Sequence, residues 1–166
     1  MVIRDRLRVL VVIANPEDVS ALDLDQERTR IAKSWGTCPG VDVTFLETAT
    51  LSELKKELRD GSFNVLHYMG HADFDEATGK GVLVMEREDR SSHLVDAAVI
   101  GGLLRDEEAL QLVFLNACET AQGRLGAFSG VAAAIVDAGA PAVVAMQFKV
   151  TDQAATAFAE HFYDSI

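Results

Sequence analysis

A cysteine and a histidine each lie just beyond a buried-strand pattern, and together they have the chemistry of a nucleophile with its general base. Cys118 follows the apolar run Leu112–Leu115 within a few residues, and His71 follows the apolar run Phe63–Met69 in the same way. An imidazole close to a thiol lowers the pKa of the thiol, accepts its proton and later returns that proton to the leaving group. The two residues therefore indicate acyl-transfer chemistry.

The pattern of the two apolar runs predicts how these residues could meet, although 47 positions separate them in the chain. Neither run alternates cleanly with polar residues, which is typical of strands covered on both faces. In an open parallel sheet, the residues just past the carboxyl ends of the strands gather at one edge, where such folds bind ligands. We therefore expect His71 and Cys118 to be neighbours at that edge.

Strand patterns alternate with helix patterns along the rest of the chain, which predicts an α/β domain with a mainly parallel sheet. Thr50 and Asp96 have the residue types that cap helices, and Thr50 begins a capping box with Glu53. We predict a loop at Ala72–Lys80, followed by a small hairpin. The predicted strands are 8–14, 41–46, 63–69, 111–115 and 142–146, the hairpin strands are 82–85 and 93–95, and the helices are 23–34, 50–61, 96–104, 130–138 and one from Thr151.

The composition indicates a single globular domain and disfavours some classes of partner. A chain of 166 residues with 49% hydrophobic and 25% charged residues is long enough to bury a real core. Its net charge is -11, and residues 61–166 hold 15 acidic but only six basic residues. Such a surface repels phosphate backbones, so we expect no direct contact with nucleic acid. The charge mildly favours a basic peptide partner, although acidic surfaces usually serve solubility.

The ends of the chain and its two cysteines lead to expectations about location. The chain begins without a signal-peptide pattern, and its apolar stretches are too short for a bilayer span, so we expect a soluble cytoplasmic protein with no membrane partner. Cys38 lies in a turn pattern and reads as a loop thiol, without a disulfide to Cys118. The final helix pattern stops abruptly at Ile166, which predicts that residues 1–166 are one domain of a longer protein.

Several motifs together resemble the CHAT family, the caspase-like domains of clan CD cysteine peptidases, which are often fused to repeats or NTPase modules. The resemblance covers residues 60–166 well and the first 60 residues loosely. Gly-His alone would be a weak signal, but Gly-His followed by Asn-Ala-Cys-Glu-Thr is a specific one. The matching motifs are HYMGH at 67–71, LVFLNACET at 112–120, GVA at 130–132, AGA at 138–140 and VVAMQFKVTD at 143–152.

The resemblance implies a three-layer αβα sandwich and hydrolysis of peptide bonds by a dyad of His71 and Cys118. In the family pattern the backbone N–H groups of Gly70 and Cys118 form the oxyanion hole. No cofactor and no metal are implied. The implied partners are a polypeptide substrate and the attached sensor domains or repeats that regulate such proteases.

The same resemblance assigns three residues to substrate binding. Asn116 falls where relatives shape the S1 pocket, which receives the side chain before the cleaved bond. Gln147 and Phe148 fall where the backbone of a substrate strand would pair. Many members have a tryptophan where this chain has Phe148, so the aromatic platform is kept but the indole N–H is lost.

Other interpretations remain beside this one. A caspase-like fold can be kept as a catalytically silent binding or scaffold module. A metal site from His67, His71, Asp73 and Asp75 is disfavoured, because ligands four apart at a strand end do not share one helix face. We expect His67 to be a buried, hydrogen-bonded histidine and the two aspartates to be solvated in a loop. A dinucleotide site is discarded, because the turn at 14–18 has two acids and no glycine.

Overall fold

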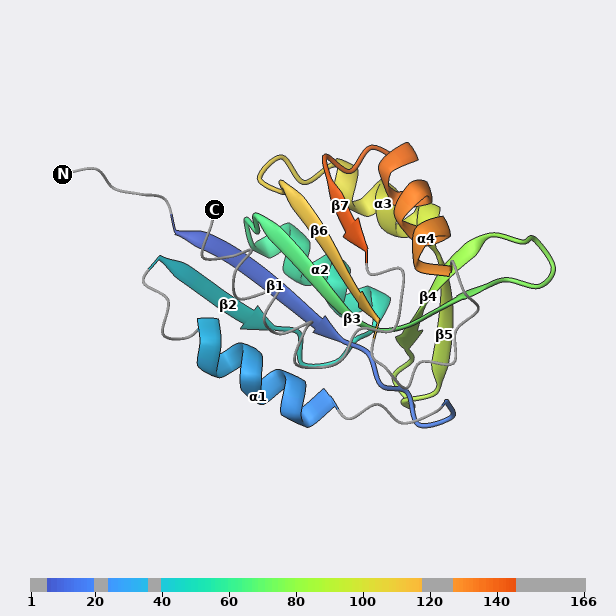
Figure 1. Ribbon diagram of the computed structural model, residues 1–166, viewed down its shortest axis with the longest axis horizontal. Helices are drawn as coiled ribbons and strands as arrows, with labels where there is room; N and C mark the ends of the chain where they lie inside the picture. Colours follow the sequence, from blue (N-terminus) through green and yellow to red (C-terminus); the bar gives the residue numbers. More distant parts are fainter. Residues whose placement is uncertain (1–5, 20–23, 36–39, 118–126, 146–166) are drawn as a thin grey trace.

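The structure of the protein, a computed structural model, describes residues 6–19, 24–35, 40–117 and 127–145. These residues form a seven-stranded sheet with helices on both faces (Figure 1). Helix α1 (Leu24–Trp35) covers one face, and α2 (Leu51–Asp60), α3 (Ala97–Arg105) and α4 (Ala127–Asp137) cover the other. The caspase-like three-layer αβα arrangement expected from the sequence is confirmed.

The sheet is mostly parallel, with an antiparallel hairpin at one side. The strands are β1 (Leu7–Ile13), β2 (Val41–Phe45), β3 (Val65–Phe74), β4 (Gly81–Glu86), β5 (Ser92–Asp96), β6 (Leu112–Ala117) and β7 (Val143–Ala145). Strand β3 is central: β1 and β6 pair with it in parallel, β2 pairs in parallel with β1, and β7 with β6. The hairpin β4–β5 joins β3 in antiparallel fashion. The predicted mainly parallel sheet and the predicted hairpin are both confirmed.

Strand β3 is longer than the sequence predicted. The predicted strand ended at Met69 and the segment from Ala72 was predicted as loop, whereas β3 continues through Phe74. The extra residues are strand because β4 pairs with them, and periodicity along one segment cannot reveal a distant pairing partner. Only the turn that follows fits the predicted loop, and it is closed by the Asp75 N–H on the Lys80 carbonyl at 2.8 Å.

Other boundaries also differ from the predictions, and one predicted element cannot be compared. Strand β6 continues two residues past Leu115, because Asn116 and Ala117 pair with β3. Helix α4 begins three residues before the predicted start at Gly130. The predicted helix from Thr151 lies outside the described residues.

The predicted helix caps are confirmed, because they depend on local chemistry. The Thr50 side chain accepts a hydrogen bond from the Glu53 N–H at 3.2 Å, and the Asp96 side chain accepts one from the Ala98 N–H at 2.8 Å. Each cap satisfies one of the N–H groups that the first turn of a helix leaves without a partner.

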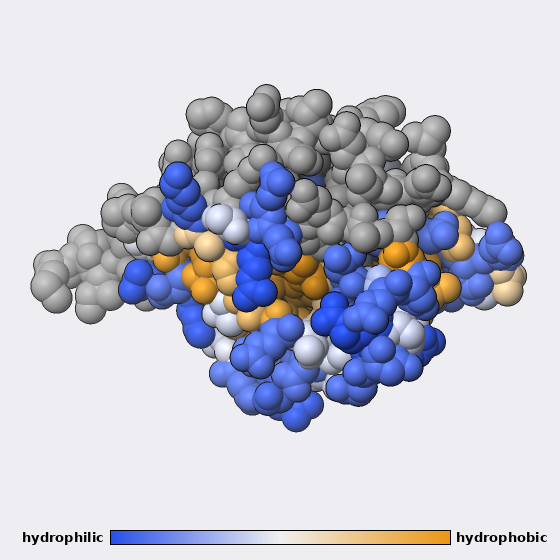
Figure 2. Space-filling view, turned by 90° about the horizontal axis from the view of Figure 1, so that it is seen from below, coloured by the Kyte–Doolittle hydropathy of each residue, from blue (hydrophilic) through white to orange (hydrophobic). Residues whose placement is uncertain are grey.

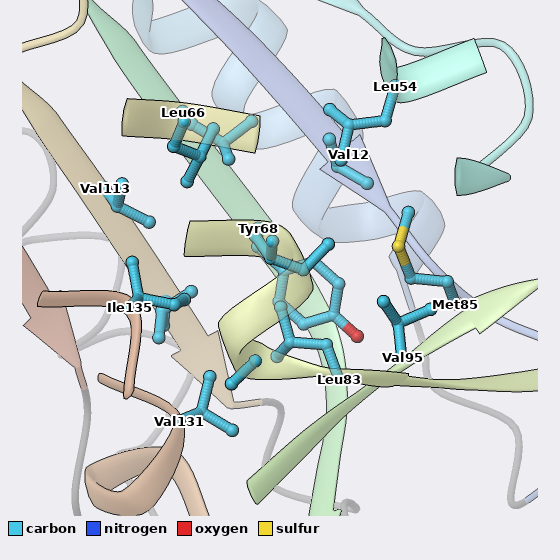
Figure 3. Close-up of a cluster of buried hydrophobic side chains, with 14 of the residues drawn as sticks. Val12, Leu54, Leu66, Tyr68, Leu83, Met85, Val95, Val113, Val131 and Ile135 are labelled. Atoms are coloured by element: carbon cyan, nitrogen blue, oxygen red, sulfur yellow. The ribbon is translucent and has the colours of Figure 1, made fainter. Parts of the chain in front are cut away.

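The alternation of side chains along β3 divides the core into two clusters. Even-numbered residues from Leu66 to Ala72 pack against α2, α3 and α4, and Tyr68 lies in the middle of this larger cluster (Figure 3). Odd-numbered residues such as Val65 and Met69 pack on the α1 face against Trp35. Seen from below, hydrophilic residues cover most of the described surface, and hydrophobic residues show only between them (Figure 2). Burial of both clusters is the main source of the free energy of folding.

Candidate active site

His71 lies where strand β3 changes its pairing partners. Within the described residues, the parallel ladder between β3 and β6 reaches Gly70 paired with Ala117, and the antiparallel ladder with β4 begins with His71 paired with Val84. His71 is 8% exposed, and by alternation it lies on the same face of the sheet as Met69. The imidazole is therefore carried by a paired strand at the carboxyl edge of the parallel sheet.

Gly70 is buried next to this histidine, and its neighbours explain why no side chain is present. A Cβ at this position would lie 2.6 Å from the Tyr68 hydroxyl oxygen and 3.0 Å from the carbonyl oxygen of Ala14. The first distance is too short for a real carbon contact and the second is tighter than most, so any larger residue would force the Tyr68 ring, and to a smaller extent the backbone at Ala14, to move. The close approach of the backbone is what glycine allows here.

Asn116 lies on the neighbouring strand and brings a free polar atom to the same face. It pairs with Met69, and it is 5% exposed. Its Oδ1 atom is buried and has no hydrogen-bond partner among the described residues. A buried acceptor without a partner is uncommon and needs an explanation, such as a water or a ligand group. Asn116 therefore offers an acceptor close to the strand edge that carries His71.

Three of the predicted site residues cannot be placed. Cys118, Gln147 and Phe148 lie outside the described residues. The structure brings Gly70, His71 and Asn116 together on adjacent positions of β3 and β6. The last pair of that ladder, Gly70 with Ala117, directly precedes His71 and Cys118 in the sequence.

His67 is buried as predicted, but the predicted hydrogen bonds are wrong. Its ring centroid lies 5.4 Å from that of Trp35 and 4.7 Å from that of Phe114, and neither ring nitrogen has a partner among the described residues. Aromatic side chains from α1 and β6 fill the space where polar partners would be needed. Burial lowers the pKa of His67 from 6.5 to about 3, so the imidazole is neutral at physiological pH.

The aspartates near His71 are bound within their own segments. Asp73 Oδ1 accepts a hydrogen bond from the Phe74 N–H at 2.8 Å. Asp75 accepts from the Thr78 hydroxyl at 2.7 Å and from the Ala77 N–H at 3.0 Å, and the bond from Thr78, followed by that from Ala77, lowers the pKa of its carboxyl group. Among the residues that the structure describes, no three His, Cys, Asp or Glu side chains are grouped to hold a metal ion.

The segment after β1 docks on the hairpin, an interaction that the sequence did not reveal. Glu86, 6% exposed at the end of β4, accepts a hydrogen bond from the Asn15 N–H at 2.8 Å. Asp18 accepts from the Ser92 N–H and hydroxyl at 2.7 and 2.9 Å, and Glu17 pairs with Arg90 at 2.9 Å. The acids of this turn are therefore engaged by the hairpin.

Tyr68 contacts the backbone of the candidate site, which the sequence did not reveal. Its hydroxyl oxygen lies 2.8 Å from the carbonyl oxygens of both His71 and Val84. A tyrosine two positions before Gly70, on the same side of the strand, was the available signal in the sequence. The contact with Val84 depends on β4, whose pairing with β3 the sequence did not predict.

Comparison with known proteins supports the assignment made from the motifs. Within the described residues, no helix is long and apolar enough to cross a membrane. No curated protein matches the chain. The model of the CHAT domain matches residues 3–166, nearly all of the 166 residues. With the three-layer fold already described, this match shows that the chain belongs to the CHAT domain family, which is caspase-like and related to cysteine peptidases.

Proposed function

We propose that this protein is a cysteine endopeptidase in which Cys118 is the nucleophile and His71 is its general base. The observation that carries the proposal is the register of β3 with β6, whose last pair among the described residues is Gly70 with Ala117. In the sequence, His71 directly follows Gly70 and Cys118 directly follows Ala117. Under the proposal, the pairing of β3 with β6 explains why the Gly-His motif and the Asn-Ala-Cys motif each follow a buried strand.

Covalent geometry supports this pairing without any further assumption. Paired strands lie about 4.8 Å apart and one trans peptide spans about 3.8 Å, so the Cα atoms of His71 and Cys118 are at most about 12 Å apart. Side chains of a histidine and a cysteine that turn toward each other can meet over most of this range, although not at its upper limit. Proton exchange then requires heavy atoms within about 3 Å.

The proposed reaction proceeds in two halves. His71 takes the thiol proton, and the Cys118 sulfur attacks the carbonyl carbon of the scissile peptide bond. The tetrahedral intermediate collapses, the carbon–nitrogen bond breaks, and the amine leaves with the proton from the imidazole. A water molecule, deprotonated by His71, then attacks the thioester and releases the acid product with regeneration of the thiol.

Backbone and side-chain groups around the dyad supply the remaining functions. The N–H groups of Gly70 and Cys118 are proposed to stabilise the oxyanion. Asn116, with its unpartnered buried Oδ1, is proposed to line the S1 pocket. Gln147 and Phe148 are proposed to pair with the backbone of the polypeptide substrate.

The proposed setting is a longer parent protein in the cytoplasm. A catalytic thiol must stay reduced, which the reducing cytoplasm provides. Domains attached to the CHAT domain, or partner proteins, would switch the peptidase between a latent and an active form. The net charge of -11 supports a polypeptide substrate rather than nucleic acid.

The test is a peptide-library cleavage profile of the parent protein, in which the wild type is compared with variants of Cys38 and Cys118. Cys118→Ala should abolish cleavage, whereas the control Cys38→Ala should cleave like the wild type. A peptide carrying a thiol-directed electrophile should label Cys118 and spare Cys38. Equal cleavage by wild type and Cys118→Ala would refute the proposal, and an inert Cys118 in the folded parent protein would identify a silent binding module instead.

A further inference from the structure

A single side chain joins β3 and β4 at the point where β3 changes its pairing. Up to Gly70 the strand pairs in parallel with β6, and from His71 it pairs antiparallel with β4. Where a strand passes from one ladder to another, some backbone groups need partners outside the ladders. The Tyr68 hydroxyl lies 2.8 Å from the carbonyl oxygen of His71 and 2.8 Å from that of Val84, and it shares its one hydrogen between them.

The same hydroxyl also occupies the space beside Gly70. A Cβ on Gly70 would lie 2.6 Å from the Tyr68 oxygen and 2.9 Å from the ring carbon that carries it. The Tyr68 ring therefore fills the space that a side chain at Gly70 would need. Gly70 and His71, the proposed oxyanion donor and general base, are both held by contacts to one phenol.

Tyr68 makes these contacts from the far side of the sheet. It is 2% exposed and lies in the core cluster between the sheet and helices α2, α3 and α4, close to Leu83 (Figure 3). His71 lies on the opposite face by alternation along the strand. The phenol cannot touch a substrate that binds at His71, so any effect on the reaction must pass through the backbone.

We infer that the Tyr68 hydroxyl is a positioning group for the peptidase reaction, an inference that rests on the proposed function. It fixes the backbone of Gly70 and His71 relative to the hairpin, and so fixes the directions of the oxyanion N–H and of the imidazole. A displacement of about 1 Å in a catalytic group can lower a rate by roughly 100-fold. Loss of the hydroxyl should therefore lower kcat by about 10- to 100-fold and leave KM within about twofold.

The experiment compares Tyr68→Phe, which removes only the hydroxyl, with Ile135→Val in the parent protein. Ile135 lies in the same core cluster, on α4, and its replacement loosens that cluster without touching the carbonyl groups of β3 or β4. Both variants are measured below the onset of melting, as followed by circular dichroism. The readouts are kcat and KM for the best library peptide, and the pH midpoint for alkylation of Cys118 by iodoacetamide.

The expected result is a lower kcat and a raised alkylation midpoint in Tyr68→Phe, with both unchanged in Ile135→Val. If Tyr68→Phe keeps the wild-type kcat and the wild-type midpoint, or if Ile135→Val shows the same losses, the positioning role is overturned. If the wild type neither cleaves peptides nor alkylates at Cys118 faster than at Cys38, the dyad itself fails and the inference fails with it. If the wild type alkylates selectively but does not cleave, the midpoint alone decides the role of Tyr68.

Discussion

The imidazole of His67 packs against the ring of Phe114, its register partner on the next strand, with 4.7 Å between the ring centroids. An apolar residue at this place in the core would bring no polar atom that needs a hydrogen-bond partner. Its neutral imidazole carries one N–H donor and one acceptor, and burying both without hydrogen bonds lowers stability.

Replacing His67 by Leu should flatten the dependence of stability on pH. Because burial lowers the pKa from 6.5 to about 3, the unfolded chain binds a proton between these values that the folded protein does not. The stability of the wild type is therefore fully present above pH 6.5 and falls by up to about 1.4 kcal/mol per unit as the pH decreases toward 3.

Urea denaturation at pH 7 and pH 5 measures this effect. The wild type should lose about 2 kcal/mol more than His67→Leu between the two values. His93→Gln, at a partly exposed position on β5, is the control and should lose as much as the wild type. An equal loss in wild type and His67→Leu would show that His67 is protonated in the folded state.

Replacing His71 by Ala should remove the activation of the thiol. With His71 present, the alkylation midpoint of Cys118 should lie well below the value of about 8.5 for a free cysteine, and without it the midpoint should return to about 8.5. Peptide cleavage should fall by roughly 100- to 10,000-fold, because general base catalysis is lost. Rates of iodoacetamide reaction from pH 5 to 10 test this directly, with His93→Gln as the matched histidine control. Identical midpoints in all three proteins would exclude His71 as the base.

Two adjacent glycines in α3 should respond to alanine in opposite directions. A Cβ on Gly102 would meet nothing within 4 Å, so Gly102→Ala should stabilise the helix by about 0.5 to 1 kcal/mol. A Cβ on Gly101 would lie 2.5 Å from the Cβ of Ala138 and 3.1 Å from the Cα of Ile135, so Gly101→Ala should destabilise the packing of α3 on α4. Thermal melts of the two variants serve as each other's control, and a shift of the same sign in both would contradict the observed packing.

Asp96 contributes to stability in two ways, as the N-cap of α3 and as the ion-pair partner of Lys80, and two substitutions separate them. Asp96→Ala removes the acceptor for the Ala98 N–H and should cost about 1 kcal/mol. Asp96→Asn keeps an equally good cap and removes only the exposed pair with Lys80 at 3.4 Å, which should change stability by a few tenths of a kcal/mol. If urea denaturation finds equal losses in both variants, the ion pair is the larger contribution.

Features that depend on local chemistry could be predicted from the sequence, and features that depend on distant pairing could not. The caps at Thr50 and Asp96 lie where the residue types indicated, because a cap bonds within one helical turn. The ends of β3 and β6 were predicted too early, because residues such as Ala72 and Asn116 are strand only through partners elsewhere in the chain.

The candidate site shows the same division. Burial of His67 followed from its place on the apolar side of its run, but its lack of hydrogen-bond partners depends on Trp35 and Phe114, which come from two other elements. The contact between Tyr68 and Val84 depends on β4 and was equally hidden. The position of Cys118 beside His71 stays a prediction.

The course of β3 decides which part of this protein can act as a switch. Strands on both sides pair with it up to Met69, β6 also pairs with Gly70, and the hairpin holds it from His71 to Phe74. Reorienting the imidazole through its main chain would mean unzipping a buried sheet, a change too expensive for a signal to drive reversibly. Under the proposed function, the orientation of the His71 main chain is thus set at folding, and control over turnover has to be exerted elsewhere, such as on access of the polypeptide to be cut.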